Sequence, residues 1–525
     1  MLFNSYIFIF AFLPITYVVY FLFAKYKGVE SAIVFLVIAS LFFYSWWEPI
    51  YLVLMLFSIV INYFLGEIIF HYRTVKDLQK AKTLLIIGLV LNLGLLGYYK
   101  YATFIVDNAS IILSIDTNID HIILPLAISF FTFQQVAFLI DTYKGITKEL
   151  KFSHYALFVT FFPQLIAGPI VHHKEMLPQF LKLDSMKNAV KPQLENVIIG
   201  LTIFSLGLFK KVVIADGVAQ YSTPVFNAAA IGDSLSFFTA WGGALSYTFQ
   251  LYFDFSGYSD MAIGIARIFG IQLPLNFFSP YKSKNIIEFW RRWHITLSRF
   301  LRDYIYFSLG GNRKGNCRRY VNLLTTMLLG GLWHGAGWTF VFWGGLHGLY
   351  LIINHAWHFI KKKSNLNFLD QQPIWKCASW VLTFISIVNA WVFFRAATFN
   401  TAIEILKGMY GFNGIELPNA IYARLGFFSN RLMDLGVTTY IGGGSQFIFT
   451  YLWIAVLLFI SLLMPNTQQI LRNYSSPTVN QGNALFDKGI LSNVLVFRYS
   501  LPWALLMSGI LVIAIFGLTR VSEFL

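Results

Sequence analysis

A histidine in an apolar, glycine-rich segment is the first side chain that could do chemistry. His334 lies in the run GGLWHGA at residues 330–336, inside a stretch (321–354) without Asp, Glu, Lys or Arg. An ionisable residue in such a segment is costly and by default marks a functional path. A neutral imidazole can take the proton of a hydroxyl that attacks an acyl carbonyl and then return it to the leaving group. Taken alone, His334 fits equally well a hydrogen-bonded structural histidine.

The second histidine of interest, His294, lies in a segment (286–305) that divides into two faces at about 100° per residue. Large apolar residues fall on one face, and charged residues crowd the other, including Arg291, Arg292, Arg299 and Arg302. This pattern predicts an amphipathic helix over about 285–306 that lies along the cytoplasmic interface. Its basic face suits the phosphates of a cytoplasmic donor, or anchors the helix to anionic lipid head groups. His294 lies at the edge between the faces, where it can turn toward a buried cavity.

Three further motifs contain polar or helix-breaking residues in apolar surroundings. Asp254, Ser256, Tyr258 and Asp260 end an apolar run, where they form either a polar cluster or a capped helix start. Pro163, Gln164 and Pro169 belong to the run FPQLIAGPI, whose prolines must break or kink a helix and so shape a cavity. His347, thirteen residues after His334, is expected to be its structural partner.

Composition excludes most other classes of protein. Charged residues make up 12% of the 525 positions, whereas soluble domains carry about 25%. The net charge of +15 fits the excess of Lys and Arg in cytoplasmic loops, and no nucleic-acid-binding module accompanies it. The two cysteines, Cys317 and Cys377, have no metal-ligand spacing, so we expect no metal site. Nucleotide-binding loops, a nucleophile elbow and a zinc-protease histidine pair are also missing from the sequence.

The predicted fold is an all-α polytopic membrane protein with about 11–14 transmembrane or re-entrant helices. We divide the chain into a transmembrane catalytic core (1–395), a polar extramembrane or interfacial section (396–446) and C-terminal transmembrane helices with a polar connection (447–525). The basic residues in 73–82, 282–319 and 361–363 place these three connections in the cytoplasm. The side of the 396–446 section stays open.

These motifs, in this order, resemble the membrane-bound O-acyltransferase family, and in particular its bacterial branch of alginate O-acetyltransferase membrane subunits. The resemblance runs from Leu124 to Gly335. It rests on the runs LPLAISF (124–130), FPQLIAGP (162–169), QLYFDFSGYSDMAIG (250–264), LGGNRKG (309–315) with Asn312, and Trp333-His334-Gly335, together with the segment from Phe289 to Tyr306.

The resemblance implies that His334 is the family's membrane-embedded catalytic histidine and that His294 is its second histidine. It also implies a bowl of helices in the bacterial inner membrane, with no permanently bound cofactor and with acetyl-CoA as a cytoplasmic co-substrate. The expected acceptor is an exopolysaccharide or peptidoglycan hydroxyl outside that membrane, reached through a periplasmic or membrane-anchored esterase-like partner. Whether an acyl-enzyme intermediate forms stays open.

Two alternatives to acetyl transfer remain at this stage. A D-alanyl transferase for teichoic acid shares both histidine motifs but takes its acyl group from a carrier protein. A proton-coupled transporter would use the same histidines to carry protons, without consuming a thioester.

Overall fold

The computed structural model describes residues 1–114, 122–147, 151–185, 192–474, 491 and 493–519, and these are almost entirely helical. Within these ranges, six helical stretches are long and apolar enough to cross a membrane, and two shorter apolar helices accompany them. The six stretches are Phe8–Tyr26, Ile50–Thr74, Leu78–Leu113, Leu194–Ala230, Pro373–Arg395 and Gly444–Leu463. The prediction of an all-α polytopic membrane protein is therefore confirmed.

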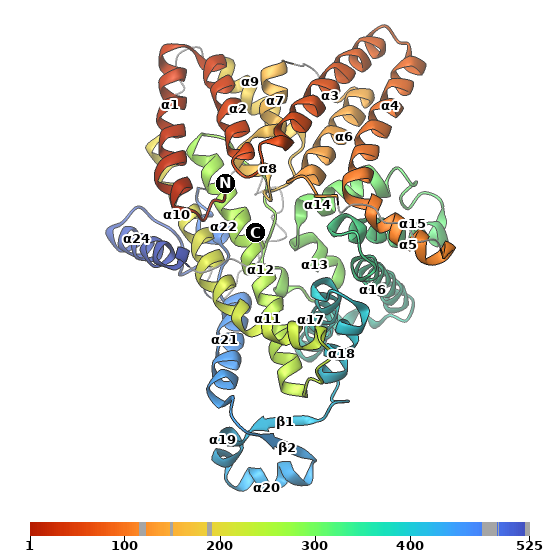
Figure 1. Ribbon diagram of the computed structural model, residues 1–525, viewed down its shortest axis with the longest axis vertical. Helices are drawn as coiled ribbons and strands as arrows, with labels where there is room; N and C mark the ends of the chain where they lie inside the picture. Colours follow the sequence, from red (N-terminus) through yellow and green to blue (C-terminus); the bar gives the residue numbers. More distant parts are fainter. Residues whose placement is uncertain (115–121, 148–150, 186–191, 475–490, 492, 520–525) are drawn as a thin grey trace.

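The N-terminal helices gather at one end of the longest axis (Figure 1). α1 packs on α2 and α3 packs on α4, while α6 packs on both α3 and α4, and α7 packs on the distant α2. The elements are η1 (Phe8–Phe12), α1 (Leu13–Tyr26), α2 (Val29–Ser45), α3 (Ile50–Thr74), α4 (Leu78–Leu96), η2 (Gly97–Tyr101), α5 (Ala102–Leu113), α6 (Ile128–Lys144), α7 (Phe152–Thr160), α8 (Phe162–Leu165) and α9 (His173–Ser185). The helix is interrupted at Phe161, between α7 and α8, and the predicted proline motif follows directly.

The centre of the molecule is formed by α10 (Leu194–Phe209), η3 (Lys210–Ala215), α11 (Asp216–Ala230) and α12 (Phe237–Ile268). α10 and α12 pack closely along two pairs of glycines. A Cβ atom on Gly207 would lie 2.6 Å from the carbonyl oxygen of Gly257, and one on Gly200 would lie 2.6 Å from that of Gly264. Small residues at such crossings let helix backbones approach closely in a membrane protein.

The reading of Asp254–Asp260 as a capped helix start is wrong. These residues lie in the middle of α12, which continues to Ile268, and they are largely buried. Their backbone amides therefore bond within the helix, and their side chains are free to face neighbouring helices.

The predicted single helix over about 285–306 is also wrong, because the structure divides it into α13 (Ile286–Arg292), α14 (Ile295–Phe300) and η5 (Leu301–Tyr306). His294, at the break, has a φ of 42°, a left-handed conformation that interrupts the helix. The segment 276–278 supplies the missing backbone partners: Phe278 N donates to Arg292 O at 2.9 Å, and Ile295 N donates to Asn276 O at 2.9 Å.

The helices that follow are α15 (Gly315–His334), α16 (Trp338–Lys363), α17 (Pro373–Arg395) and α18 (Phe399–Met409), and the first three line the chamber described below. Two short turns, η4 (Pro280–Lys282) and η6 (Leu366–Gln371), lie before α13 and between α16 and α17. α15 and α16 form a tight hairpin. A Cβ atom on Gly344 would lie 3.1 Å from the Cα atom of Gly331, and the reverse distance is the same. This crossing lies one turn before His334.

A small section at the opposite end from the N-terminal helices contains the only strands in the described ranges (Figure 1). β1 (Ile415–Pro418) pairs in parallel with β2 (Val437–Tyr440), with Ile415 opposite Val437. α19 (Asn419–Tyr422), η7 (Ala423–Leu425) and α20 (Phe427–Asp434) connect them. The chain then continues into α21 (Gly444–Leu463), α22 (Thr467–Ile470), α24 (Leu501–Phe516) and η8 (Gly517–Thr519). Much of the polar connection predicted between α22 and α24 lies outside the described residues.

Candidate active site

A chamber of about 170 Å³ lies where α12, α15, α16, α17 and the break between α13 and α14 meet. Aromatic rings make up most of its wall, and two histidines, one carboxylate and one phenol add the polar groups. The lining residues are Ala167, Leu251, Asp254, Phe255, Tyr258, Trp293, His294, His334, Trp343, Trp391 and Phe394. Mostly apolar walls with a few convergent polar groups are typical of small-molecule sites.

His334 is the last residue of α15, and its imidazole faces this chamber. The rings of Trp333, Trp343 and Phe394 surround it, with centroids 4.8, 5.1 and 5.1 Å from its own. No side-chain hydrogen bond of His334 is found within the described part of the chain, and the residue is half-buried. Its ring nitrogens are thus available to a bound molecule.

The end of α15 is held in place by η2, a segment more than two hundred residues earlier in the chain. Tyr101 Oη donates to the carbonyl oxygen of Leu332 at 2.9 Å, and Lys100 Nζ donates to that of Trp333. The last carbonyls of a helix have no partner within the helix. Lys100 and Tyr101 therefore satisfy these carbonyls and fix the position of the neighbouring His334.

His294 is oriented by a buried amide. Its Nδ1 lies 3.0 Å from Asn276 Oδ1, which also accepts a hydrogen bond from Thr296 Oγ1 at 2.9 Å. Because a carbonyl oxygen only accepts, the proton of a neutral His294 resides on Nδ1, and Nε2 carries the lone pair. Nε2 is buried and has no partner among the described residues. His294 lies outside the candidate membrane-spanning helices, and burial lowers the pKa of its imidazole to about 3.

The two histidines lie side by side in the chamber, with ring centroids 6.4 Å apart. They come from segments forty residues apart, which the left-handed turn at His294 and the α15–α16 hairpin bring together. A neutral imidazole with a free nitrogen can accept a proton from an attacking hydroxyl and, once protonated, donate it to a leaving thiolate. The arrangement therefore suits acyl transfer.

Asp254 and Tyr258 also line the chamber, one turn apart on α12. Asp254 forms an ion pair with Lys211 of η3, and Lys211 also contacts Asp216 at 3.1 Å. A buried carboxylate is stable only when it is paired, so Lys211 allows Asp254 to stay at the chamber wall. Sequence reasoning named Asp254 but missed Lys211.

Three of the other predicted residues lie next to the chamber without lining it. Trp333 stacks on Phe133 at 5.5 Å, and Gly335 ends α15. His347 is fully buried against Trp290 and Trp343, and neither of its ring nitrogens has a partner among the described residues. The predicted residues that do not line the chamber are Trp333, Gly335, Ser256, Asp260, Pro163, Gln164, Pro169, Asn312 and His347.

Two of these residues form contacts elsewhere in the structure, and a third is exposed. Asp260 pairs with Lys210 at 2.6 Å, Gln164 Nε2 donates to Phe158 O at 2.6 Å, and Asn312 is exposed. The proline loop that contains Gln164 still reaches the site. Ala167 lines the chamber, and Ile170 N donates to Thr296 Oγ1 at 3.0 Å, beside His294.

The four arginines do not share one basic face. Arg299 forms a two-pronged pair with Glu175 at 2.6 and 2.9 Å, and Arg302 pairs with Asp303 at 2.8 Å. Arg292 is buried and pairs with Glu288 at 2.8 Å. Arg291 is exposed, and no ion pair of its side chain occurs in the described ranges. The break at His294 separates Arg291 and Arg292, on α13, from Arg299 and Arg302, on α14 and η5.

A second buried polar network, which sequence reasoning missed, lies beside η5. Tyr304 Oη donates to Asp141 Oδ2 at 2.7 Å and lies 3.2 Å from His172 Nδ1, while His173 Nδ1 lies 3.5 Å from the same carboxylate oxygen. Asp141 lies in no recognisable sequence motif, and it comes close to His173 only in the folded chain. Across the described ranges, no group of three or more His, Cys, Asp or Glu side chains could hold a metal ion.

Comparison with known proteins gives a consistent result. The sequence pattern of the MBOAT, membrane-bound O-acyltransferase family, matches residues 142–394, which include both histidines. A peptidoglycan O-acetyltransferase of Helicobacter pylori is 48% identical over 83% of this chain and 84% of its own length. A probable alginate O-acetylase, AlgI, of Pseudomonas aeruginosa is 41% identical over 81% of this chain and 78% of its own. A teichoic acid D-alanyltransferase of Streptococcus thermophilus is 30% identical, over 46% of this chain and 59% of its own.

Proposed function

The chain belongs to the membrane-bound O-acyltransferase family, and from that premise we propose that it takes acetyl groups from cytoplasmic acetyl-CoA and passes them across the membrane toward a cell-envelope glycan. The observation that carries the proposal is the pair His294 and His334, which line one chamber. Nε2 of His294 has no partner among the described residues, and no side-chain hydrogen bond of His334 is found there either. An acetyl donor fits because the relatives that cover most of this chain are named as O-acetylating proteins.

In the proposed reaction, an acceptor hydroxyl attacks the thioester carbonyl of the donor. The hydroxyl proton passes to a histidine nitrogen, the C–S bond breaks, and the proton then reaches the departing thiolate. We assign His334 as the base or acyl relay, because its ring has no protein partner to compete with the substrate. His294 is assigned to the second proton position, since its Nε2 lone pair is fixed by Asn276.

The acceptor is proposed to be a hydroxyl of an exopolysaccharide or of peptidoglycan, reached through an esterase-like partner protein outside the membrane. On the donor side, Arg291 is the best placed of the four arginines for the phosphates of CoA, because the other three already pair with carboxylates. A guanidinium suits phosphate oxygens through its planar fork of donors.

The proposal is tested by the acetyl-ester content of cell-envelope glycans, measured as acetate released by mild alkali. Cells would make the wild type, His334→Ala, the control His71→Ala or no protein, at matched membrane levels. His71 is an exposed histidine on α3. We expect ester in the His334→Ala cells to fall to the level of cells without the protein, and ester in the His71→Ala cells to stay at the wild-type level.

Ester that persists in the His334→Ala cells would remove this histidine from the chemistry. The choice of acyl donor distinguishes acetyl transfer from the rival D-alanyl transfer. Purified protein in vesicles should release free thiol from acetyl-CoA, whereas a D-alanyl transferase should require an aminoacylated carrier. A transporter would move solute with no thiol release.

A further inference from the structure

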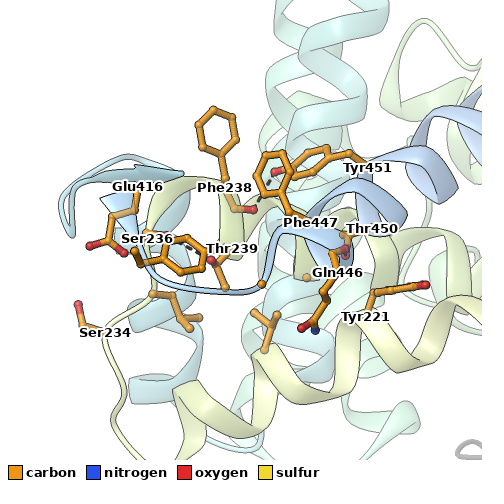
Figure 2. A pocket seen from close by; sticks show the side chains of 16 residues that line it. Tyr221, Ser234, Ser236, Phe238, Thr239, Glu416, Gln446, Phe447, Thr450 and Tyr451 are labelled. Atoms are coloured by element: carbon orange, nitrogen blue, oxygen red, sulfur yellow. Dashed lines mark hydrogen bonds between the residues drawn. The ribbon is translucent and has the colours of Figure 1, made fainter. Parts of the chain in front are cut away.

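A second cavity, of about 450 Å³, lies at the end of the molecule that carries the two strands, and it shares no lining residue with the histidine chamber. Its walls come from the C-terminal half of α11, the start of α12, the β1–β2 section and the first turns of α21 (Figure 2). The volume falls within the roughly 300–1,000 Å³ of small-molecule sites. The proposed acetyl transfer makes no use of this cavity.

Hydrogen bonds join the elements that form the walls of the cavity. Phe237 N donates to Gly414 O at 3.0 Å and so ties the start of α12 to the strand section. Tyr451 Oη donates to Phe238 O at 2.7 Å, which joins α21 to α12 (Figure 2). The rings of Phe447 and Tyr451, on successive turns of α21, pack 4.8 Å apart and form one aromatic side.

The polar groups around this aromatic side are uncharged except for one carboxylate. Ser234, Gln446 and Glu416 present a hydroxyl, an amide and a carboxylate around the opening (Figure 2). No ion pair of Glu416 is found within the described ranges, and no lining residue is Lys or Arg. Tyr440 adds a phenol, whose pKa is raised by burial and by the nearby Glu416, so it stays a hydrogen-bond donor.

We propose that this cavity binds a neutral saccharide unit, such as an N-acetylhexosamine of the glycan that receives the acetyl groups. The C–H face of a pyranose ring packs well on an aromatic ring, whose face is electron-rich. Its hydroxyl and acetamido groups need both donors and acceptors, which the amide, phenol and carboxylate supply. The inference rests on the proposed function for the identity of the glycan.

The charge of the cavity selects among possible ligands. A polyuronate carries one carboxylate on each sugar, and a phospholipid head group carries a phosphate. Either anion would meet Glu416 without any basic side chain to offset the repulsion, which opposes its binding. The cavity thus favours an uncharged, N-acetylated glycan over an alginate-like polymer.

The position of the cavity agrees with this role. α17, a candidate membrane-spanning helix, separates the basic run Lys361–Lys363 from the section that begins after Arg395. If the basic run is cytoplasmic, the cavity opens on the outer side, where a cell-envelope glycan lies.

The test uses purified full-length protein in detergent micelles and measures binding by calorimetry. The probes are a tetrasaccharide of β-1,4-linked N-acetylglucosamine and a tetramer of mannuronic acid. Glu416→Ala and Phe447→Ala are compared with Asp434→Asn and Phe449→Ala, two exposed control positions outside the cavity lining. We expect the wild type to bind only the N-acetylated probe, each cavity substitution to weaken binding by about tenfold, and the controls to change it little.

His334→Ala separates this inference from the proposed function, because it should bind the N-acetylated probe as the wild type does while losing thioester turnover. If wild-type protein binds the probe but does not use acetyl-CoA, the proposed function is contradicted and the sugar site is still supported. Equal binding of the uronate, unchanged binding in both cavity variants, or no binding by turnover-competent protein would overturn the sugar site. Displacement of the probe by added phosphatidylglycerol would assign the cavity to a lipid instead.

Discussion

At the scale of single residues, the site depends on which nitrogen of His294 carries the proton. Asn276 decides this, since its carbonyl oxygen accepts from both Nδ1 of His294 and the hydroxyl of Thr296. Its amide nitrogen donates to Ser259 Oγ at 3.2 Å, so the amide cannot rotate without losing this contact as well. The tautomer with a free Nε2 is thereby selected before any substrate binds.

Replacing this amide should impair the chemistry more than the binding of substrate. In Asn276→Ala, the Nδ1–H of His294 loses its acceptor, and the imidazole can change tautomer or rotate. We expect kcat for thiol release from acetyl-CoA to fall on the order of 10²-fold, with KM nearly constant. Asn276→Asp keeps an acceptor at the same position and should recover much of the rate. Equal losses in both variants, or a change confined to KM, would contradict a positioning role.

The sequence allowed part of this site to be predicted and not the rest. His334 and His294 stand out because ionisable residues are rare in apolar segments, and short local motifs flank both. Asn276 has no such signal. Lys100 and Lys211 do lie in apolar segments, but nothing in the sequence names the groups that they contact. Each acts through a tertiary contact with a distant segment: Lys100 bonds to the carbonyl of Trp333, and Asn276 bonds to His294. Only the folded chain defines those partners.

At the scale of elements, the segment 286–306 shows how tertiary contacts override a helical pattern. Its apolar residues recur with helical period, yet the chain turns at His294 with a positive φ. Two backbone hydrogen bonds to the neighbouring segment 276–278 replace those that a continuous helix would make. Periodicity reports which side of a segment is buried, and it carries no information on bonds to a segment elsewhere in the chain.

The α10–α12 crossing is the element contact most sensitive to side-chain size. A Cβ atom on Gly257 would lie 2.7 Å from Gly207 O and 3.0 Å from Lys211 N, and both are backbone atoms that cannot move alone. Gly257→Val should therefore separate the helices, displace Lys211 from Asp254 and lower the stability of the protein by about 1–3 kcal/mol or more.

Gly509→Val is the matched control for this substitution, because no atom lies within 4 Å of the Cβ position on α24. Thermal unfolding in detergent, monitored by size-exclusion chromatography, should show a lower midpoint for Gly257→Val alone. A midpoint for Gly257→Val equal to that of the wild type would mean that the two helices do not pack as described.

At the scale of the whole molecule, we propose that the two candidate sites lie on one path through the membrane. α17, which is apolar and long enough to cross, connects the basic run 361–363 to the section that contains the strands. The connection between α3 and α4 and the β1–β2 section lie at opposite ends of the molecule (Figure 1). The helices that line the histidine chamber lie between these two ends (Figure 1), which agrees with the proposed transfer from a cytoplasmic donor to an outer acceptor.

This arrangement predicts which cysteines can be labelled from outside the cell. The chain has two natural cysteines, Cys317 at the start of α15 and Cys377 near the start of α17, and both are exposed. They lie next to the basic connections, so a membrane-impermeant maleimide should modify them only after the inner membrane is permeabilised. In a Cys317→Ser, Cys377→Ser background, Ser445→Cys at the exposed start of α21 should react in intact spheroplasts.

Labelling of the natural cysteines in intact spheroplasts, with position 445 protected, would mean that the protein has the opposite orientation in the membrane. The donor would then have to reach the chamber from the side of the strand section, which would contradict a cytoplasmic thioester and place the saccharide cavity in the cytoplasm.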